Sequence, residues 1–197
     1  MRPQITFWIV FIILFLIFIF LDFKYNLFRD SSTARKQPYS FSRLQLSWWT
    51  LIILSSFITI ILSRGDIPIF NESTLILLGM SSATSILGSI IDLADKKDNN
   101  TLRHQNDESQ GLILDIISDQ NGASIHRLQT VMFNFVFGIW MIFTVIINLI
   151  NPFLNNISLI FPDIKDNNLV LIGLSSATYI ALKIPENKAI QKTPPVL

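Results

Sequence analysis

Two serine-containing stretches are the part of the sequence whose residue types could do covalent chemistry. They read GMSSAT, ending at Thr84, and GLSSAT, ending at Thr178, and loosely resemble the surroundings of a nucleophilic serine. Such a serine needs a base at its own depth, but the only histidines, His104 and His126, lie outside the apolar segments. No lysine or acid lies within those segments either. The sequence therefore argues against an enzyme and predicts no catalytic residue, cofactor site or metal site.

The same stretches fit helix packing better than catalysis, because small residues let helix backbones approach closely in lipid. Pore lining by the serines is the second interpretation. The packing candidates are Gly79, Ala83, Gly173 and Ala177. The candidates for packing or pore lining are Ser81, Ser82, Ser175 and Ser176, together with Thr130 and Asn134 from another segment.

A polar stripe runs along the segment that contains those last two residues. Thr130, Asn134, Gly138, Met141 and Asn148 recur at steps of four, four, three and seven, a spacing that places them on one face of a helix. Such a stripe joins neighbouring helices more often than it lines a water path. In either case we expect a buried Asn134 to find a hydrogen-bond partner.

The composition indicates that these segments belong to an integral membrane protein. Half of the 197 residues are hydrophobic, 15% are charged, and the mean hydropathy is +0.49. A soluble core could not bury that much apolar surface. Five apolar segments are predicted as transmembrane helices: residues 5–21, 47–62, 75–91, 131–150 and 169–182. The first is expected to be an uncleaved anchor that faces lipid with most of its surface.

Positive charges divide unevenly between the two sides that five crossings define. Twelve of the fifteen Lys and Arg fall on one side, and only Arg2, Arg64 and Lys165 fall on the other. The positive-inside bias therefore predicts an external N-terminus and a cytoplasmic C-terminus in the inner (plasma) membrane. The formal charge of +1 argues against a nucleic-acid partner, which a strongly basic surface would hold. The absence of cysteine excludes a disulfide framework.

The chain also contains an internal repeat of a two-helix unit. Residues 43–45 and 127–129 both read RLQ, and the two GxSSAT stretches follow them in the same order. Both units enter the membrane from the same side, so we expect a pseudo-twofold axis along the membrane normal rather than an inverted repeat. The predicted fold is all-α, with an N-terminal transmembrane helix followed by two tandem helical hairpins.

Four charged residues occupy equivalent positions in the two copies of the repeat. Arg43 and Arg127 stand where each first helix enters the membrane, and Asp92 and Glu186 stand where each second helix leaves it. We expect each arginine to form an ion pair with an acidic group, within its own hairpin or across the pseudo-twofold axis, because an unpaired charge at this boundary is costly. The alternative is that all four side chains reach the lipid headgroups.

The predicted organisation follows from these features. It comprises an anchor (1–23), a basic connector (24–40), hairpin 1 (41–92), a cytoplasmic linker (93–123), hairpin 2 (124–186) and a flexible tail (187–197). Within the linker, GLILDIISDQNG is predicted to form a short amphipathic helix that stops at Asn121 and Gly122. Its two acids favour docking on protein, either on this chain's own RLQ ends or on a neighbour.

The runs ILDIISDQNGASIHRLQ and LVLIGLSSATYIALKIPE resemble stretches of a family of uncharacterised bacterial inner-membrane proteins. The resemblance covers about residues 39–186, which include both hairpins and exclude the first span. It implies a bacterial helical membrane protein. It implies no activity and no functional residue.

Two functions fit the sequence. The first is a multi-pass protein in the lipid bilayer that self-assembles, in its sharpest form as a homo-oligomeric channel lined by the serines, Thr130 and Asn134, with the four charged residues at its mouth. The second is a non-conducting anchor or scaffold that binds a cytoplasmic protein through residues 109–122. The second gains weight because no ionisable residue lies deep in a predicted span, whereas most ion-coupled transporters have one.

Overall fold

Five long helices make up most of the chain in the structure, a computed structural model that describes all residues except 1, 98–105, 120, 152–153, 155 and 187–197. They are α1 (Pro3–Tyr25), α2 (Phe41–Arg64), α3 (Glu72–Lys97), α5 (Ile125–Ile150) and α6 (Asp166–Glu186). Each is long and apolar enough to cross a membrane, so the prediction of an all-helical fold with five such segments is confirmed. Most of the helix ends lie two to six residues outside the predicted spans, although α5 ends at Ile150 as predicted. Helix α3 continues past residue 91 to Lys97.

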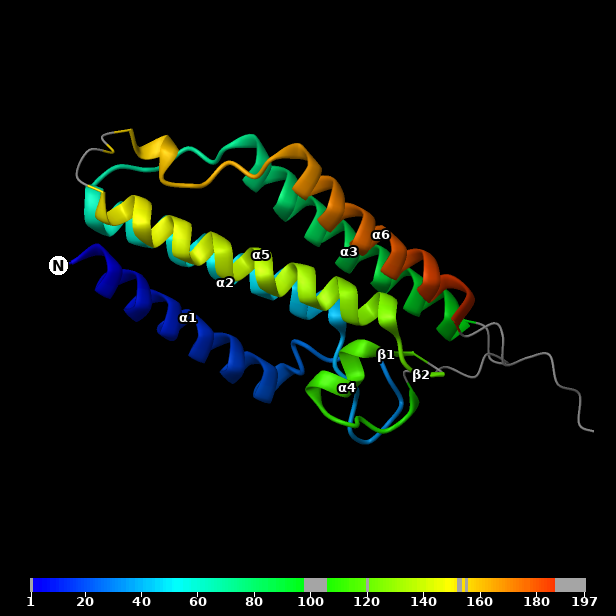
Figure 1. The fold of residues 1–197 in the computed structure, drawn as a ribbon. Helices are drawn as coiled ribbons and strands as arrows, with labels where there is room; N and C mark the ends of the chain where they lie inside the picture. The colour runs from blue at the N-terminus through cyan, green and yellow to red at the C-terminus, as the bar shows by residue number, and fades with distance from the viewer. Residues whose placement is uncertain (1, 98–105, 120, 152–153, 155, 187–197) are drawn as a thin grey trace, which may run out of the picture.

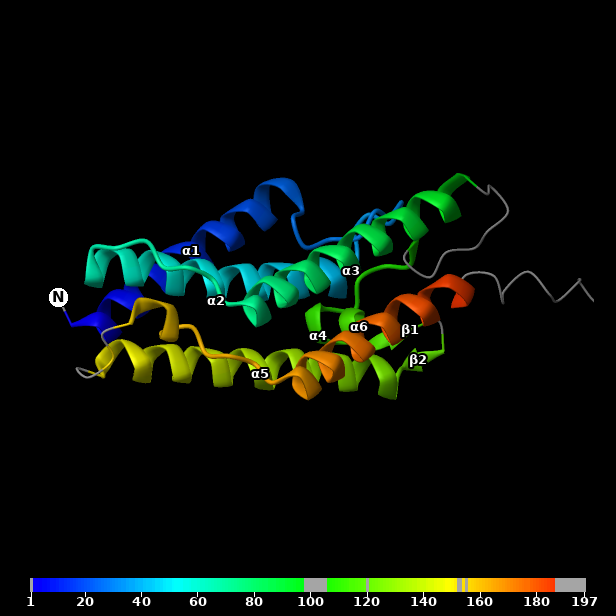
Figure 2. The ribbon, with the colours of Figure 1, turned by 90° about the horizontal axis from the view of Figure 1, so that it is seen from above.

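Four of these helices form a bundle, and the first lies against one side of it. In the bundle α2 contacts α3 and α5, and α6 contacts α3 and α5. Helix α1 packs on α2 and α5 (Figure 1), and Figure 2 shows the same arrangement from above. Only Thr6 and Phe7 of α1 are buried, because this helix packs against the bundle along one side and leaves its other side uncovered.

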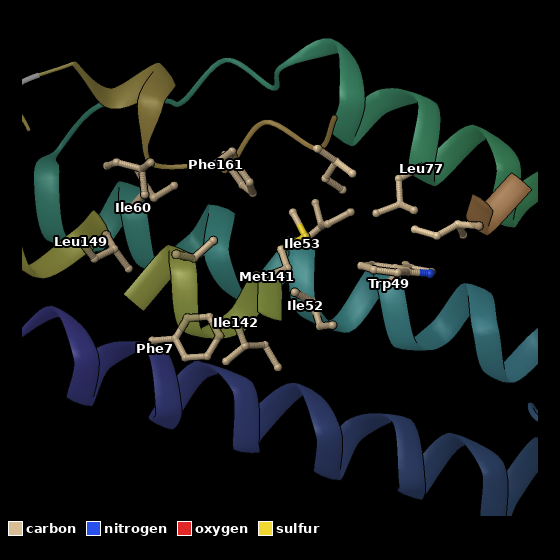
Figure 3. Close-up of a cluster of buried hydrophobic side chains, with 14 of the residues drawn as sticks. Phe7, Trp49, Ile52, Ile53, Ile60, Leu77, Met141, Ile142, Leu149 and Phe161 are labelled. Atoms are coloured by element: carbon tan, nitrogen blue, oxygen red, sulfur yellow. The ribbon is translucent and has the colours of Figure 1, made fainter. Parts of the chain in front are cut away.

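Large apolar side chains fill the centre of the bundle. Trp49, Ile52, Leu77, Met141 and Ile172 have no exposed surface, and Figure 3 shows the first four converging between the helices. Four of the five stripe residues of α5, from Thr130 to Met141, are buried. The predicted polar face of this helix is therefore the face that packs into the bundle.

The connection between α5 and α6 folds back onto the end of the bundle where α2 also joins α3 (Figure 1). The Asn148 side chain donates hydrogen bonds to the carbonyl oxygens of Leu159 and Ile160, and the Asn71 side chain donates to those of Phe161 and Pro162. The longer connection of the second hairpin is thus held by two asparagines, one from each hairpin.

The other end of the bundle carries a small cap, made of residues 26–40, residues 106–119 and strand β2 (Figure 1). It contains α4 (Leu112–Ile117) and a two-stranded antiparallel hairpin, β1 (Ser118–Asp119) with β2 (Gly122–Ala123). The Asp115 carboxylate joins its two halves by accepting from the Tyr39 backbone N–H, 3.0 Å, and from the Gln110 N–H, 2.8 Å.

The cap corrects one expectation about the short amphipathic helix. The helix ends at Ile117 and not at Asn121, because Ser118 and Asp119 already pair with Ala123 and Gly122 as strands. Gly122 has φ +102°, a backbone conformation that glycine adopts readily. The helix docks on this chain itself, against α5 and α2, which is one of the two docking alternatives.

A tight contact between α2 and α5 gives a test of this packing. A Cβ atom added to Gly138 would overlap the Trp48 indole, whereas one added to Gly79 would meet no atom within 4 Å. We expect Gly138→Ala to lower the free energy of unfolding by about 1–3 kcal/mol, the usual cost of overpacking. Gly79→Ala, also in a helix, should leave stability unchanged or raise it by up to about 1 kcal/mol. Thermal unfolding in detergent measures both, and equal effects would contradict the contact.

Candidate functional site

The Asn134 carboxamide is the centre of a buried polar cluster between α2, α5 and α6. Its Nδ2 donates to the Thr130 carbonyl oxygen of its own helix, 2.8 Å. Its Oδ1 then accepts from Trp49 Nε1, 2.8 Å, and from Gln45 Nε2, 3.1 Å. Gln45 Nε2 also donates to Ser176 Oγ, 2.9 Å. One amide of α5 thereby holds two side chains of α2, and through Gln45 it reaches α6.

The hydroxyl groups predicted to pack or to line a pore are mostly satisfied within the bundle. Ser81 Oγ donates to the Leu77 carbonyl and Ser175 Oγ to the Leu171 carbonyl, each one turn back on the same helix. Thr130 Oγ1 lies 2.9 Å from the His126 carbonyl oxygen and 3.2 Å from that of Ser175 on α6. Ser81, Ser175, Ser176, Thr130 and Asn134 are all buried, and Ser82 is half-buried.

The four small residues predicted to pack helices lie in two different environments. Gly173 faces Met80 of α3, where an added Cβ would lie 2.9 Å from the sulfur atom. Gly79, Ala83 and Ala177 are exposed. Ala83, Ala177 and Gly173 line apolar grooves of about 490 and 360 Å³ along α3 and α6. Only one of the four therefore makes a close helix contact within this chain.

An ion pair is buried at the cap end of the bundle. The Lys183 side chain on α6 is 1% exposed, and its Nζ donates to Asp92 Oδ2 on α3 at 3.0 Å. Asp30 of the cap lies on the other side of this amine, with its Oδ2 3.9 Å away. One lysine thus brings together both hairpins and the residues that follow α1.

The four charged residues singled out in the sequence have different environments. Asp92 has the partner just described, and the Arg127 guanidinium lies over the Tyr179 ring, 5.3 Å from its centroid. Arg43 is half-buried in the first turn of α2, without an ion pair to the described residues. Glu186 is the last residue of α6, and its side chain lies outside the described part of the structure.

A cavity of about 190 Å³ lies between the cap and the ends of α5 and α6. Lys183, Arg127 and Tyr179 form its bundle side. Carboxylates dominate its cap side: Asp30, Asp107, Glu108, Asp115 and Asp119. The two cations are already engaged, Lys183 by carboxylates and Arg127 by the Tyr179 ring. The open surface therefore favours cationic or hydrogen-bond-donating groups over anions.

Sequence reasoning misses Lys183, Asp30, Gln45 and Trp49 as parts of these clusters. In the sequence, Lys183 contributes only to the uneven distribution of positive charges that predicts the topology, because it follows the last apolar residue of its segment. The sequence does contain a signal for Gln45 and Trp49, since they stand four residues apart and share a helix face. A polar pair on one helix and an asparagine stripe on another together indicate a shared buried cluster.

Nothing matches this chain in comparisons with family models, curated proteins and solved structures. Conclusions about its function therefore rest on the chemistry of the residues described above. Those residues provide a buried polar cluster, a buried ion pair and an exposed small-residue face.

The ion pair leads to a prediction about stability. Lys183→Met leaves the Asp92 and Asp30 carboxylates without their buried cation, so we expect a loss of about 3–5 kcal/mol, as when one partner of a buried pair is removed. Thermal unfolding in detergent measures the loss, and Lys165→Met, which removes an exposed lysine at the opposite end, should change little. Adding Asp92→Leu to Lys183→Met should recover part of the stability. Additive losses in the double variant would contradict the pairing.

Proposed function

We propose that the protein is a multi-pass protein of the inner membrane that self-assembles through the outer face of α3 and α6. Its N-terminus lies outside and its C-terminus in the cytoplasm, as the uneven distribution of Lys and Arg favours. The hairpins α2–α3 and α5–α6 are the two copies of the repeat that the sequence predicts. Contacts between α2 and α5 and between α3 and α6 fit two copies that lie side by side in the same orientation, whereas a twofold axis along the bundle would place α2 next to α6 and α3 next to α5.

The observation that carries the proposal is the small-residue surface of α3 and α6. Gly79, Ala83 and Ala177 are exposed, and the grooves beside them are almost entirely apolar. In lipid, helices associate through close van der Waals contact at small residues. Helix α1 covers α2 and α5, so the α3/α6 face is left for contact with another copy.

The proposal places any conducting path between copies rather than within one chain. Trp49, Leu77 and Ile172 fill the centre of the bundle without exposed surface. Ser81 and Ser175, two of the predicted lining residues, donate their hydroxyl protons to their own helices. A homo-oligomeric channel would therefore need its water-filled path at the subunit interface.

Bulky substitutions test assembly. We expect the protein in nanodiscs to contain more than one copy by light scattering, and Ala177→Trp to shift it toward single chains by filling the groove. Val136→Trp, at an exposed position of α5, should leave assembly unchanged. Because the chain has no cysteine, Ala83→Cys gives an unambiguous cross-link between copies in membranes. A wild type with one copy per nanodisc and no cross-link would refute the proposal.

A second candidate function is a scaffold whose cap binds a cytoplasmic protein. The observation in its favour is the outer side of α4, where Ile113 is 67% exposed and Leu114 is 45% exposed. Residues 109–115 also hold the cap together, since Ser109 Oγ donates to the Asp115 carboxylate at 2.6 Å. Deleting residues 109–122 would therefore disrupt the fold as well as a binding surface.

A point substitution distinguishes these effects. If the scaffold function holds, Ile113→Glu should abolish co-purification of a stoichiometric partner without changing thermal stability. Ile69→Glu, which changes an isoleucine that is 74% exposed at the opposite end of the bundle, should leave that partner bound. Purification of the wild type as a homo-oligomer with no second protein would count against this function.

A further inference from the structure

The polar cavity between the cap and the ends of α5 and α6, of about 190 Å³, contains groups that the proposed assembly does not use. More of its accessible surface is polar than apolar, and five carboxylates line it against two cations. One of these cations, Lys183, is bonded at 3.0 Å to Asp92, which stands outside the cavity lining. The cavity itself therefore has an excess of negative charge.

Asp30 is the carboxylate that this pairing leaves over. It is 8% exposed, and its Oδ2 lies 3.9 Å from Lys183 Nζ, which is too far for a hydrogen bond. Neither of its carboxylate oxygens accepts a hydrogen bond from the described residues. A carboxylate buried this deeply is costly unless it is hydrogen-bonded. A donor from outside the chain would remove that cost.

The Tyr179 hydroxyl is a second group without a partner. Tyr179 is 3% exposed and stands four residues before Lys183, on the same face of α6. Its ring packs against Phe41 and lies beneath the Arg127 guanidinium, whereas its hydroxyl forms no hydrogen bond to the described residues. Because a buried tyrosine hydroxyl usually has a partner, this one is an open hydrogen-bonding group.

Both groups can be reached from the cavity. The described side-chain atoms that are both unpartnered and sealed from solvent belong to other residues. The Asp30 oxygens and the Tyr179 hydroxyl lack a hydrogen bond as well, but they keep some accessible surface, and both side chains line this cavity. A small group that enters it can therefore contact the carboxylate and the hydroxyl.

Charge and size restrict what this group can be. An ionised carboxylate only accepts hydrogen bonds, so the ligand must donate, and the excess negative charge favours a cation. Among the described residues no group of three or more His, Asp or Glu is placed to hold a metal ion, so an organic cation fits better than a divalent metal. The volume is below the 300–1,000 Å³ or so of a pocket for a drug-sized molecule. A small ammonium ion, which has only donors, meets all of these conditions.

The rest of the lining indicates what the ammonium group is attached to. Pro38, Phe41 and Leu114 provide apolar surface, against which a short methylene chain can pack. On the cap side, Glu108 and Asp119 add two more carboxylates, which would attract a second positive charge. A short chain with an ammonium group at each end therefore matches the cavity along its length.

We propose that this cavity binds a short linear diamine. One ammonium group donates to the Asp30 carboxylate and to the Tyr179 hydroxyl, and the other faces the carboxylates of the cap. The site does not depend on self-assembly, because it shares no residue with the grooves of the α3/α6 face.

The experiment is calorimetric titration of the full chain, in phosphatidylcholine nanodiscs at physiological ionic strength, with the four-carbon diamine putrescine. We expect saturable binding of one putrescine per chain. Butanediol with its hydroxyl groups at the two ends has the same length without the charge, so it should bind at least about tenfold more weakly, the effect of one charged hydrogen bond. Loosely held counter-ions would give several amines per chain without saturation. That result, or no binding in the millimolar range, would overturn the proposal.

Two variants and a matched control locate the site. Asp30→Asn keeps the size of the side chain and removes its charge, so it should weaken putrescine binding at least about tenfold. Asp66→Asn, which changes an exposed aspartate at the opposite end of the bundle, should leave the affinity unchanged. Tyr179→Phe removes only the hydroxyl and should weaken binding about fivefold, the effect of one neutral hydrogen bond.

Asp30 also pairs with Lys183, so thermal unfolding in detergent checks that Asp30→Asn still folds. If it does not, Tyr179→Phe decides, because the ring that packs against Phe41 is retained in it. Unchanged putrescine affinity in folded Tyr179→Phe would refute the site, as would equal losses in Asp30→Asn and Asp66→Asn.

Discussion

The hydrogen bonds at the Asn134 carboxamide are the interaction on which the arrangement of α2, α5 and α6 depends. In a bilayer, apolar contacts between helices are barely better than contacts with lipid chains, so they do not fix how one helix slides or turns on another. The Trp49 and Gln45 N–H groups need an acceptor, and Asn134 Oδ1 provides it at one depth only. This requirement sets the register of α2 against α5, and the bond from Gln45 to Ser176 extends it to α6.

The close approach of α2 and α5 has the same origin. Trp48 donates to the Asn134 carbonyl oxygen, and its indole then lies against Gly138, one helical turn further along, where no side chain could fit. The polar cluster and the glycine are therefore parts of a single contact. At the cap end, Lys183 provides a similar restraint with charge instead of amides, since its partners Asp92 and Asp30 come from two separate parts of the chain.

The helices and their buried faces can be predicted from the sequence, whereas the side chains that pair with one another across the bundle cannot. Five long helices follow from hydropathy alone, and the buried face of α5 follows from the spacing of Thr130, Asn134 and Gly138. The ion pair of Lys183 with Asp92 joins residues 91 positions apart, and nothing in local periodicity relates them. The cap hairpin is not predicted for another reason, because Asn121 and Gly122 indicate a helix stop as well as a turn between strands.

The polar groups around Asn134 are not arranged evenly, because every N–H donor there is paired whereas one acceptor, Gln45 Oε1, has no partner among the described residues. All three N–H donors that point at Asn134, from Gln45, Trp48 and Trp49, have acceptors. The unpaired atom is a carbonyl oxygen, and proteins leave buried oxygens unsatisfied more often than buried N–H groups. Satisfying Gln45 Oε1 from within would need a further donor, which the described residues do not provide. The cluster therefore keeps all of its N–H groups paired and leaves one hydrogen bond unmade at a buried carbonyl oxygen.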